Sequence, residues 1–91
     1  MSVSLSVHEP MRRILKGGRI ELDWSGGSVA ELIEELGRRY GPAVKRELLD
    51  SEGNLDYTYR VFINDSQAED MKTPVRDGDE VIILMPVSGG H

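Results

Sequence analysis

Short runs of alternating apolar and polar residues surround one long amphipathic stretch, and this order limits the possible folds more than any other feature of the chain. Apolar residues at positions 3, 5 and 7 alternate with serines, and a second alternating run covers residues 19–24 after the turn signal Gly17-Gly18. A period of two is typical of a strand with one buried face. The two runs predict an N-terminal hairpin, with a long loop that holds Met11, Ile14 and Leu15.

Residues 28–40 form the clearest predicted element. Apolar side chains recur there at helical spacing, namely Val29, Leu32, Ile33, Leu36 and Tyr40. Ser28 stands where an N-cap is expected, and Glu31 follows three residues later as its capping-box partner. Gly41-Pro42 predicts the end of this helix. A second short helix is expected over residues 43–49, with Val44, Leu48 and Leu49 turned inward.

Two more strands are predicted in the second half of the chain. Tyr57, Tyr59, Val61 and Ile63 alternate with other residues, and Asn64-Asp65 supplies a turn. Residues 73–79 are expected to form a loop that ends in a tight turn. A last strand should cover residues 80–85, and Pro86 should end its pairing because proline has no backbone N–H.

The element order predicts an α+β fold: a mixed sheet of four to five strands, with one main helix packed on one face. We expect the first and last strands to lie parallel and adjacent. The predicted domain covers residues 1–86, and residues 87–91 are expected to form a flexible diglycine tail. Ninety-one residues suit a single domain with a modest core.

Composition excludes several classes of function. Sixteen acidic against eleven basic residues give a net charge of −5, which argues against nucleic acid as a partner. The absence of cysteine excludes disulfides, thiolate metal sites and a cysteine nucleophile. No apolar run is long enough to span a membrane, and no signal peptide is recognisable at the N-terminus, so a cytoplasmic location is the expectation.

The C-terminal segment Ser88-Gly89-Gly90 is the candidate functional part of the chain. It follows the last predicted strand closely, and the two glycines lack side chains. A backbone of this kind can pass through a channel too narrow for larger residues, which suits an enzyme that acts on a terminal carboxylate. A frayed chain end is the alternative, because glycine is common in such ends.

The approach to this tail resembles a known family. Residues 77–81, Asp-Gly-Asp-Glu-Val, lead to Met85-Pro86-Val87-Ser88-Gly89-Gly90, as in ubiquitin-like sulfur carriers of the MoaD/ThiS type. A weaker resemblance covers Thr73-Pro74, residues 61–64 and the helix of residues 28–40. The chain length is closer to the small subunit of molybdopterin synthase and to cysteine-synthesis carriers than to the shorter thiamine carrier.

The resemblance implies a ubiquitin-like β-grasp fold and a carrier that performs no catalysis itself. An ATP-dependent activating enzyme would adenylate the carboxylate of Gly90, and sulfur would then replace AMP to give a thiocarboxylate. Gly89 would be its unhindered neighbour and Ser88 part of the same tail. No cofactor would be bound, since the partner enzyme uses the ATP and the sulfur donor.

The resemblance leaves the acceptor of the sulfur open. A sulfur-accepting synthase of molybdopterin or of sulfur amino-acid biosynthesis would be the second partner. The chain would count as a synthase subunit only in complex with a MoaE-like partner. Two other functions stay open: a protein modifier joined to lysines through Gly90, and an interaction module that does not use its tail.

His91 departs from the family pattern, because it converts the carboxylate of Gly90 into an amide. It could be a cloning-derived residue, an inert extension or a natural residue that a metallopeptidase removes. Some similar carriers are encoded with residues after the diglycine and are trimmed by a zinc peptidase.

The strand phases predict where partners dock. Phe62, Ile82 and Leu84 should lie on the open face of the sheet beside the exit of the tail, with Arg60, Ser4 and Ser6 around them. No residue is predicted to be catalytic and none to bind a metal. His8 is expected to be a solvent-facing strand residue, and the glutamates of the main helix are expected to form an ordinary exposed face with Arg38 and Arg39.

Overall fold

The computed structural model describes residues 1–85, and the predicted tail lies outside the described residues. The elements follow one another along the chain as β1 (Val3–Val7), α1 (Met11–Leu15), β2 (Arg19–Leu22), β3 (Gly26–Ser28), α2 (Val29–Tyr40), α3 (Ala43–Leu48), β4 (Arg60–Ile63), β5 (Ser66–Gln67), β6 (Pro74–Arg76) and β7 (Glu80–Leu84). The expected order of hairpin, helix, strand and strand is confirmed.

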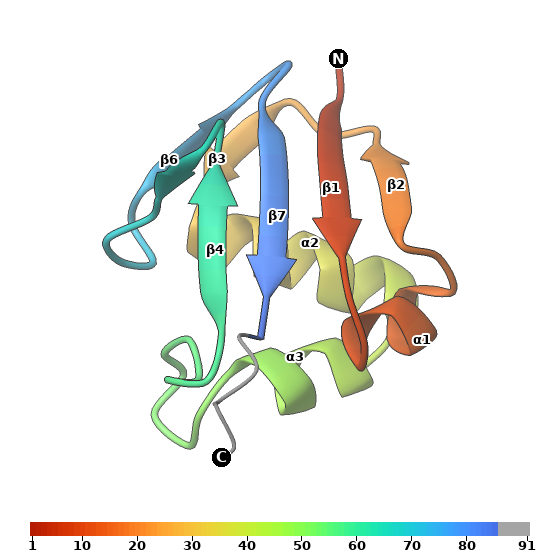
Figure 1. The fold of residues 1–91 in the computed structure, drawn as a ribbon, viewed down its shortest axis with the longest axis vertical. Coiled ribbons are helices and arrows are strands. Elements are labelled where there is room, and N and C mark those ends of the chain that lie inside the picture. The colour runs from red at the N-terminus through yellow and green to blue at the C-terminus, as the bar shows by residue number, and fades with distance from the viewer. Residues whose placement is uncertain (86–91) are drawn as a thin grey trace.

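A five-stranded mixed sheet carries the fold, in the order β2-β1-β7-β4-β5. The predicted parallel pairing of the first and last strands is confirmed, with Leu5 opposite Val81 and Val7 opposite Ile83. β2 and β4 run antiparallel to the two central strands. Figure 1 shows the helices on one side of this sheet, which leaves its other face uncovered.

The hydrophobic core lies between the sheet and α2. The strands β1, β4 and β7 alternate between buried and less buried residues, so that every second side chain enters the core. Leu32 and Leu36 of α2 are fully buried against this layer, as is Leu48 of α3. Burial of each such leucine stabilises the fold by roughly 1.5–3 kcal/mol.

The start of α2 is fixed by the predicted capping box. The Oγ of Ser28 accepts a hydrogen bond from the backbone N–H of Glu31 at 3.1 Å, and Oε1 of Glu31 accepts one from the N–H of Ser28 at 2.8 Å. Each bond satisfies an N–H group that the first turn of a helix leaves without an intrahelical partner. The strand-to-helix junction is therefore well defined.

Glu35 corrects the expectation of an ordinary exposed helix face. Its side chain is buried and forms ion pairs with Arg38 and with Arg39, the latter at 2.6 Å. Hydrogen bonds from Arg39 and Arg38 hold the pKa of Glu35 below its usual range. Arg39 also donates to the carbonyl of Asp23 at 2.6 Å, which ties α2 to the end of β2.

Three other predictions were wrong in detail. The loop expected between the first two strands contains the helix α1, and two of the three apolar side chains placed there, Met11 and Leu15, are buried. Tyr57 was placed in a strand, but β4 begins at Arg60 and the Tyr57 side chain is 85% exposed. The final strand ends at Leu84 rather than at residue 85.

A small second sheet, β3 with β6, was missed because its residues look like loop residues in the sequence. Gly26 pairs with Arg76, and Ser28 pairs with Pro74. Gly26 has a φ of 113° and lies so close to β6 that a Cβ atom would stand 2.6 Å from the carbonyl oxygen of Val75. Both the backbone conformation and the close approach require glycine at this position.

Gly26→Ala is therefore expected to destabilise the fold by roughly 1–3 kcal/mol. Thermal or urea unfolding followed by circular dichroism measures the effect. Gly17→Ala is the matched control, because a Cβ atom there meets nothing within 4 Å. Equal unfolding midpoints for the two variants would contradict the importance of the β3–β6 contact.

No helix within residues 1–85 is both long and apolar enough to cross a membrane. In the same part of the chain, no cluster of three or more His, Asp or Glu side chains is arranged to hold a metal ion.

Candidate functional site

The chain leaves the sheet at the end where the central strands β7 and β1 both finish. Ile83 of β7 lies opposite Val7, the last residue of β1, and Leu84 lies opposite Arg60, the first residue of β4. α1 and α3 lie at the same end of the molecule (Figure 1). The residues after Met85 therefore follow, in the sequence, a central strand that pairs with β1 on one side and with β4 on the other.

The start of β7 is also firmly held, through the Asp-Gly-Asp motif. Oδ1 of Asp79 accepts a hydrogen bond from Nδ2 of Asn64, and Oδ2 accepts one from the N–H of Arg76, both at 2.8 Å. Asp77 accepts a hydrogen bond from the N–H of Ser2 at 2.7 Å, and Gly78 adopts a φ of 87° that favours glycine. These residues fix the turn and the register of β7, so the acidic motif has a structural role.

The four predicted docking residues lie together on adjacent strands. Phe62 is opposite Ile82, and Arg60 is opposite Leu84, so the two pairs follow one another across β4 and β7. The apolar members are half-buried, whereas their sequence neighbours Val61, Val81 and Ile83 are buried in the core. This difference places Phe62, Ile82 and Leu84 on the open face of the sheet. We call these four residues the sheet patch.

Serines of β1 border one side of the sheet patch. Ser6 lies opposite Ile82, and Ser4 lies opposite Glu80. The Ser4 hydroxyl donates to the carboxylate of Glu21, as does that of Ser2, and these bonds lower the pKa of Glu21. The apolar residues thus lie beside small hydrogen-bonded groups, and a protein partner could approach the face closely.

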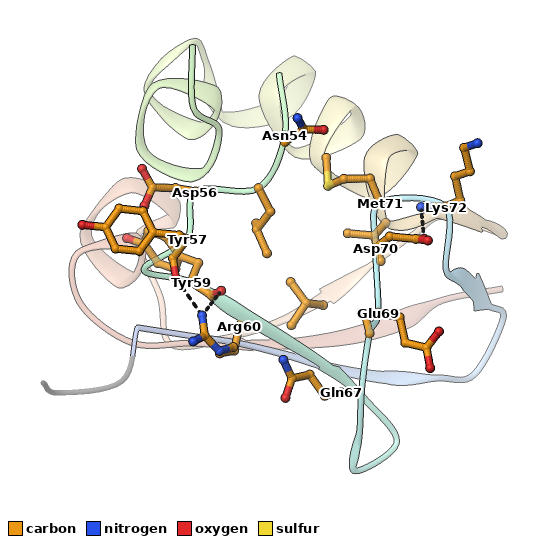
Figure 2. Close-up of a pocket in the computed structure, with 14 residues that line it drawn as sticks. Asn54, Asp56, Tyr57, Tyr59, Arg60, Gln67, Glu69, Asp70, Met71 and Lys72 are labelled. Carbon is orange, nitrogen blue, oxygen red and sulfur yellow. Dashed lines mark hydrogen bonds between the residues drawn. The ribbon is translucent and has the colours of Figure 1, made fainter. Parts of the chain in front are cut away.

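Arg60 has a second role that the sequence did not indicate. Its Nη1 donates to the carbonyl oxygens of Tyr57 and Tyr59, at 2.7 and 3.0 Å, as the dashed lines in Figure 2 show. These bonds tie the loop before β4 to the strand that flanks the tail exit. Arg60 therefore stabilises the rim of the exit in addition to its place in the sheet patch.

The same loop forms one wall of a pocket of about 600 Å³, which the sequence analysis did not predict. The pocket lies between residues 54–61 and residues 67–72, with Val29 of α2 also lining it (Figure 2). Three separate segments contribute to its lining, and no local sequence pattern reports such a meeting. Its size falls within the range of small-molecule sites, about 300–1,000 Å³.

Several polar groups around this pocket are engaged in local hydrogen bonds. Asp56 accepts from the hydroxyl and the N–H of Thr58, and both bonds lower its pKa. The hydroxyl of Tyr59 donates a hydrogen bond to Glu47 at 2.6 Å. Burial of the Tyr59 side chain raises its pKa most, and this hydrogen bond raises it further. Asp70 accepts from the N–H of Lys72 at 2.8 Å. These contacts stabilise turns and provide no arrangement of acid and base.

The predicted tail residues Ser88, Gly89, Gly90 and His91 lie outside the described residues. The structure therefore brings together the sheet patch and the exit of the tail, and the roles assigned to the tail and to the patch remain predictions.

A mixed sheet with parallel central strands and one main helix across it defines the chain as a ubiquitin-like β-grasp protein. Residues 7–90 match the ThiS family, and the chain belongs to that family. The predicted resemblance to MoaD/ThiS carriers is thereby confirmed.

Individual relatives agree with this assignment. The sulfur carrier protein CysO of Mycobacterium tuberculosis is 30% identical over 95 residues, which cover 99% of this chain and 100% of CysO. A chain in the crystal structure of the Amycolatopsis orientalis BexX/CysO complex is 27% identical, with a TM-score of 0.78, covering 97% of this chain and 99% of that one. The small archaeal modifier protein 1 (SAMP1) of Methanosarcina acetivorans is 28% identical, with a TM-score of 0.76, covering 98% and 96%. CysO is named a sulfur carrier protein, which agrees with the expectation of a carrier that performs no catalysis itself.

Proposed function

We propose that this chain carries sulfur as a thiocarboxylate on Gly90, after an ATP-dependent activating enzyme has adenylated that residue. The observation that carries the proposal is that the diglycine follows β7 closely in the sequence. β7 is a central strand paired on both sides, and its last residue, Leu84, belongs to the sheet patch. The relation to CysO over the full length of both chains supports it.

The chemistry needs two steps because a free carboxylate is a poor electrophile. In the first step, an oxygen of the Gly90 carboxylate attacks the α-phosphorus of ATP, and pyrophosphate leaves. In the second step, sulfur from a donor attacks the acyl carbon, and AMP leaves with the C–O bonding electrons. Glycine suits both steps because no side chain hinders the approach of the donor.

The carrier's own residues would position the tail and present a docking surface. The sheet patch would bind the activating enzyme, and after sulfur transfer the same face would be available to the sulfur-accepting synthase. The name CysO favours cysteine biosynthesis as the pathway, with molybdopterin synthesis as the other candidate. We place the protein in the cytoplasm, where the activating enzyme has ATP.

A protein modifier is the second candidate, and the likeness to the modifier SAMP1 of Methanosarcina acetivorans favours it. In that case the acyl-adenylate of Gly90 would be transferred to a lysine amine, and an isopeptide bond would form. Both functions share the adenylation step and differ in the nucleophile that follows.

Intact-mass spectrometry tests the proposal. A chain ending at Gly90 is incubated with the activating enzyme, ATP and a sulfide donor, and the expected result is a mass gain that matches the exchange of one oxygen for sulfur. Incubation in cell extract provides the comparison, because conjugates of higher mass would favour the modifier instead. The absence of both products would leave only an interaction module.

A further inference from the structure

The basic residues of this acidic protein are concentrated in two short segments. Residues 8–19 and 38–46 contain eight of the eleven Lys and Arg residues but only one of the sixteen acidic residues, Glu9. We call these eight the basic pole: Arg12, Arg13, Lys16, Arg19, Arg38, Arg39, Lys45 and Arg46. The rest of the chain carries fifteen acidic residues and three basic ones. Positive charge is therefore distributed very unevenly along the chain.

The fold brings the two segments together. α1 packs beside α3, and α3 in turn packs against α2. Arg12 and Arg13 occupy the last turn of α1, Arg38 and Arg39 that of α2, and Lys45 and Arg46 that of α3. All members except Lys45 are exposed. The fold therefore brings the basic last turns of three helices into one packed group, with α3 between α1 and α2.

Local ion pairs neutralise only part of this charge. Glu35 pairs with Arg38 and Arg39, Glu34 with Lys45 at 2.7 Å, and Glu9 with Arg13 at 3.8 Å. Arg19 lies 3.9 Å from Glu80, and Glu47 on α3 accepts a hydrogen bond from Tyr59. Within residues 1–85, three members of the basic pole form no ion pair with another described residue: Arg12, Lys16 and Arg46.

A structural role for these charges is the simpler alternative. Basic residues in the last turn of a helix interact favourably with the helix dipole, by about 0.3–1 kcal/mol each. That role suits α2, which has twelve residues, better than α1 and α3, which have five and six. It applies to Lys16, the C-cap residue of α1, but does not involve Arg19, which lies on β2.

The position of the basic pole relative to the tail exit indicates its use. β1 and β7 end side by side, and the chain between β1 and α1 is only three residues long, so α1 lies at the end where the tail leaves (Figure 1). An enzyme that receives the tail must therefore approach close to the charges on α1 and α3. A protein with a net charge of −5 would otherwise repel an acidic partner.

From this we infer that the basic pole binds an acidic surface of the activating enzyme beside the entrance of its tail channel. The inference rests on the proposed function and adds the chemistry of the partner's surface. Complementary charges of this kind mainly accelerate encounter and orient the two proteins, and their effect weakens as salt screens them. The basic pole would thus steer the tail toward the channel.

Matched charge reversals test this inference. One double variant, Arg12→Glu with Arg46→Glu, reverses the charge of two members of the basic pole. The control double variant, Lys72→Glu with Arg76→Glu, reverses two basic residues outside it. Each double variant has a net charge of −9 instead of −5. In ATP–pyrophosphate exchange at low salt, with chains ending at Gly90, we expect kcat/KM to fall about tenfold for the first pair and less than about twofold for the second. In 1 M salt the difference should largely disappear.

The outcomes separate the inference from the proposed function. Absence of exchange with the unmutated chain ending at Gly90 would overturn the proposed function, and with it the partner named here. Exchange that is normal and equally salt-dependent in both double variants would overturn the inference alone. Fluorescently labelled bulk tRNA serves as a further probe: binding that only the first pair abolishes would assign the basic pole to nucleic acid and overturn the inference. Melting temperatures confirm that each variant is folded.

Discussion

Removal of His91 is expected to increase the rate of adenylation at Gly90 by at least about a hundredfold. In the 91-residue chain the carbonyl of Gly90 belongs to an amide, which has no carboxylate oxygen to attack ATP. The carboxylate of His91 is displaced by one residue, about 3.5 Å in an extended chain. Misplacement of a reacting group by about 1 Å already costs about a hundredfold in rate.

ATP–pyrophosphate exchange on the 91-residue chain and on a chain ending at Gly90 measures this effect. A chain in which His91 is replaced by alanine is a useful control, because it keeps the extra residue and the Cβ atom and removes only the imidazole ring. It should be as inactive as the parent chain. Equal exchange on all three chains, with intact mass confirming that none has been trimmed, would show that the enzyme does not read the diglycine terminus. The sulfur-carrier proposal would then lose its main support.

Strands and helices with strong local patterns could be predicted from the sequence. The alternation in β1 and β7 reports directly which side chains enter the core, and the capping box at Ser28 marks the first turn of α2. The parallel pairing of β1 with β7 was also predicted. In these cases local preference and tertiary packing agree, and sequence rules then succeed.

The features that were missed depend on particular contacts, one of them between segments distant in sequence. Gly26-Gly27-Ser28 has no strand pattern, yet it pairs with β6 because Gly26 allows a very close approach of the two backbones. Tyr57 continues the alternation of β4 in the sequence. However, Thr58 donates two hydrogen bonds to Asp56, and the turn that they form delays the start of β4 to Arg60. Glu35 is buried because two arginines on the same helix neutralise its charge.

The candidate site also contains one part that the sequence predicts and one part that only the structure shows. The sheet patch follows from strand phase alone, since residues 60, 62, 82 and 84 are of one phase and the core residues of the other. The basic pole required the structure, because residues 8–19 and 38–46 become neighbours only when α1 packs beside α3. A charge count along the sequence finds the two segments but does not show that they meet.

The second large effect is expected at the sheet patch, where Phe62→Ala should weaken binding to the activating enzyme about thirtyfold, which corresponds to about 2 kcal/mol. Phe62 is the aromatic member of the patch, and buried aromatic anchors contribute much of the binding energy at interfaces. It is only half-buried in the free protein, so its truncation should cost less stability than the roughly 3–5 kcal/mol of a core phenylalanine. Leu84→Arg should weaken binding in the same way, because it places a second cation opposite Arg60.

Isothermal titration of the activating enzyme with each variant measures the dissociation constants, and thermal unfolding of the same samples measures stability. Gln67→Ala is the matched control, since Gln67 is exposed on β5 directly opposite Phe62 and keeps the strand pairing intact. Ile83→Ala shows what a core defect looks like, because Ile83 is buried one residue from Leu84. If Phe62→Ala lost its cooperative thermal transition as readily as Ile83→Ala, Phe62 would be part of the core and the sheet patch would not be a docking surface. Unchanged binding by a folded Phe62→Ala protein would equally exclude the patch from the interface.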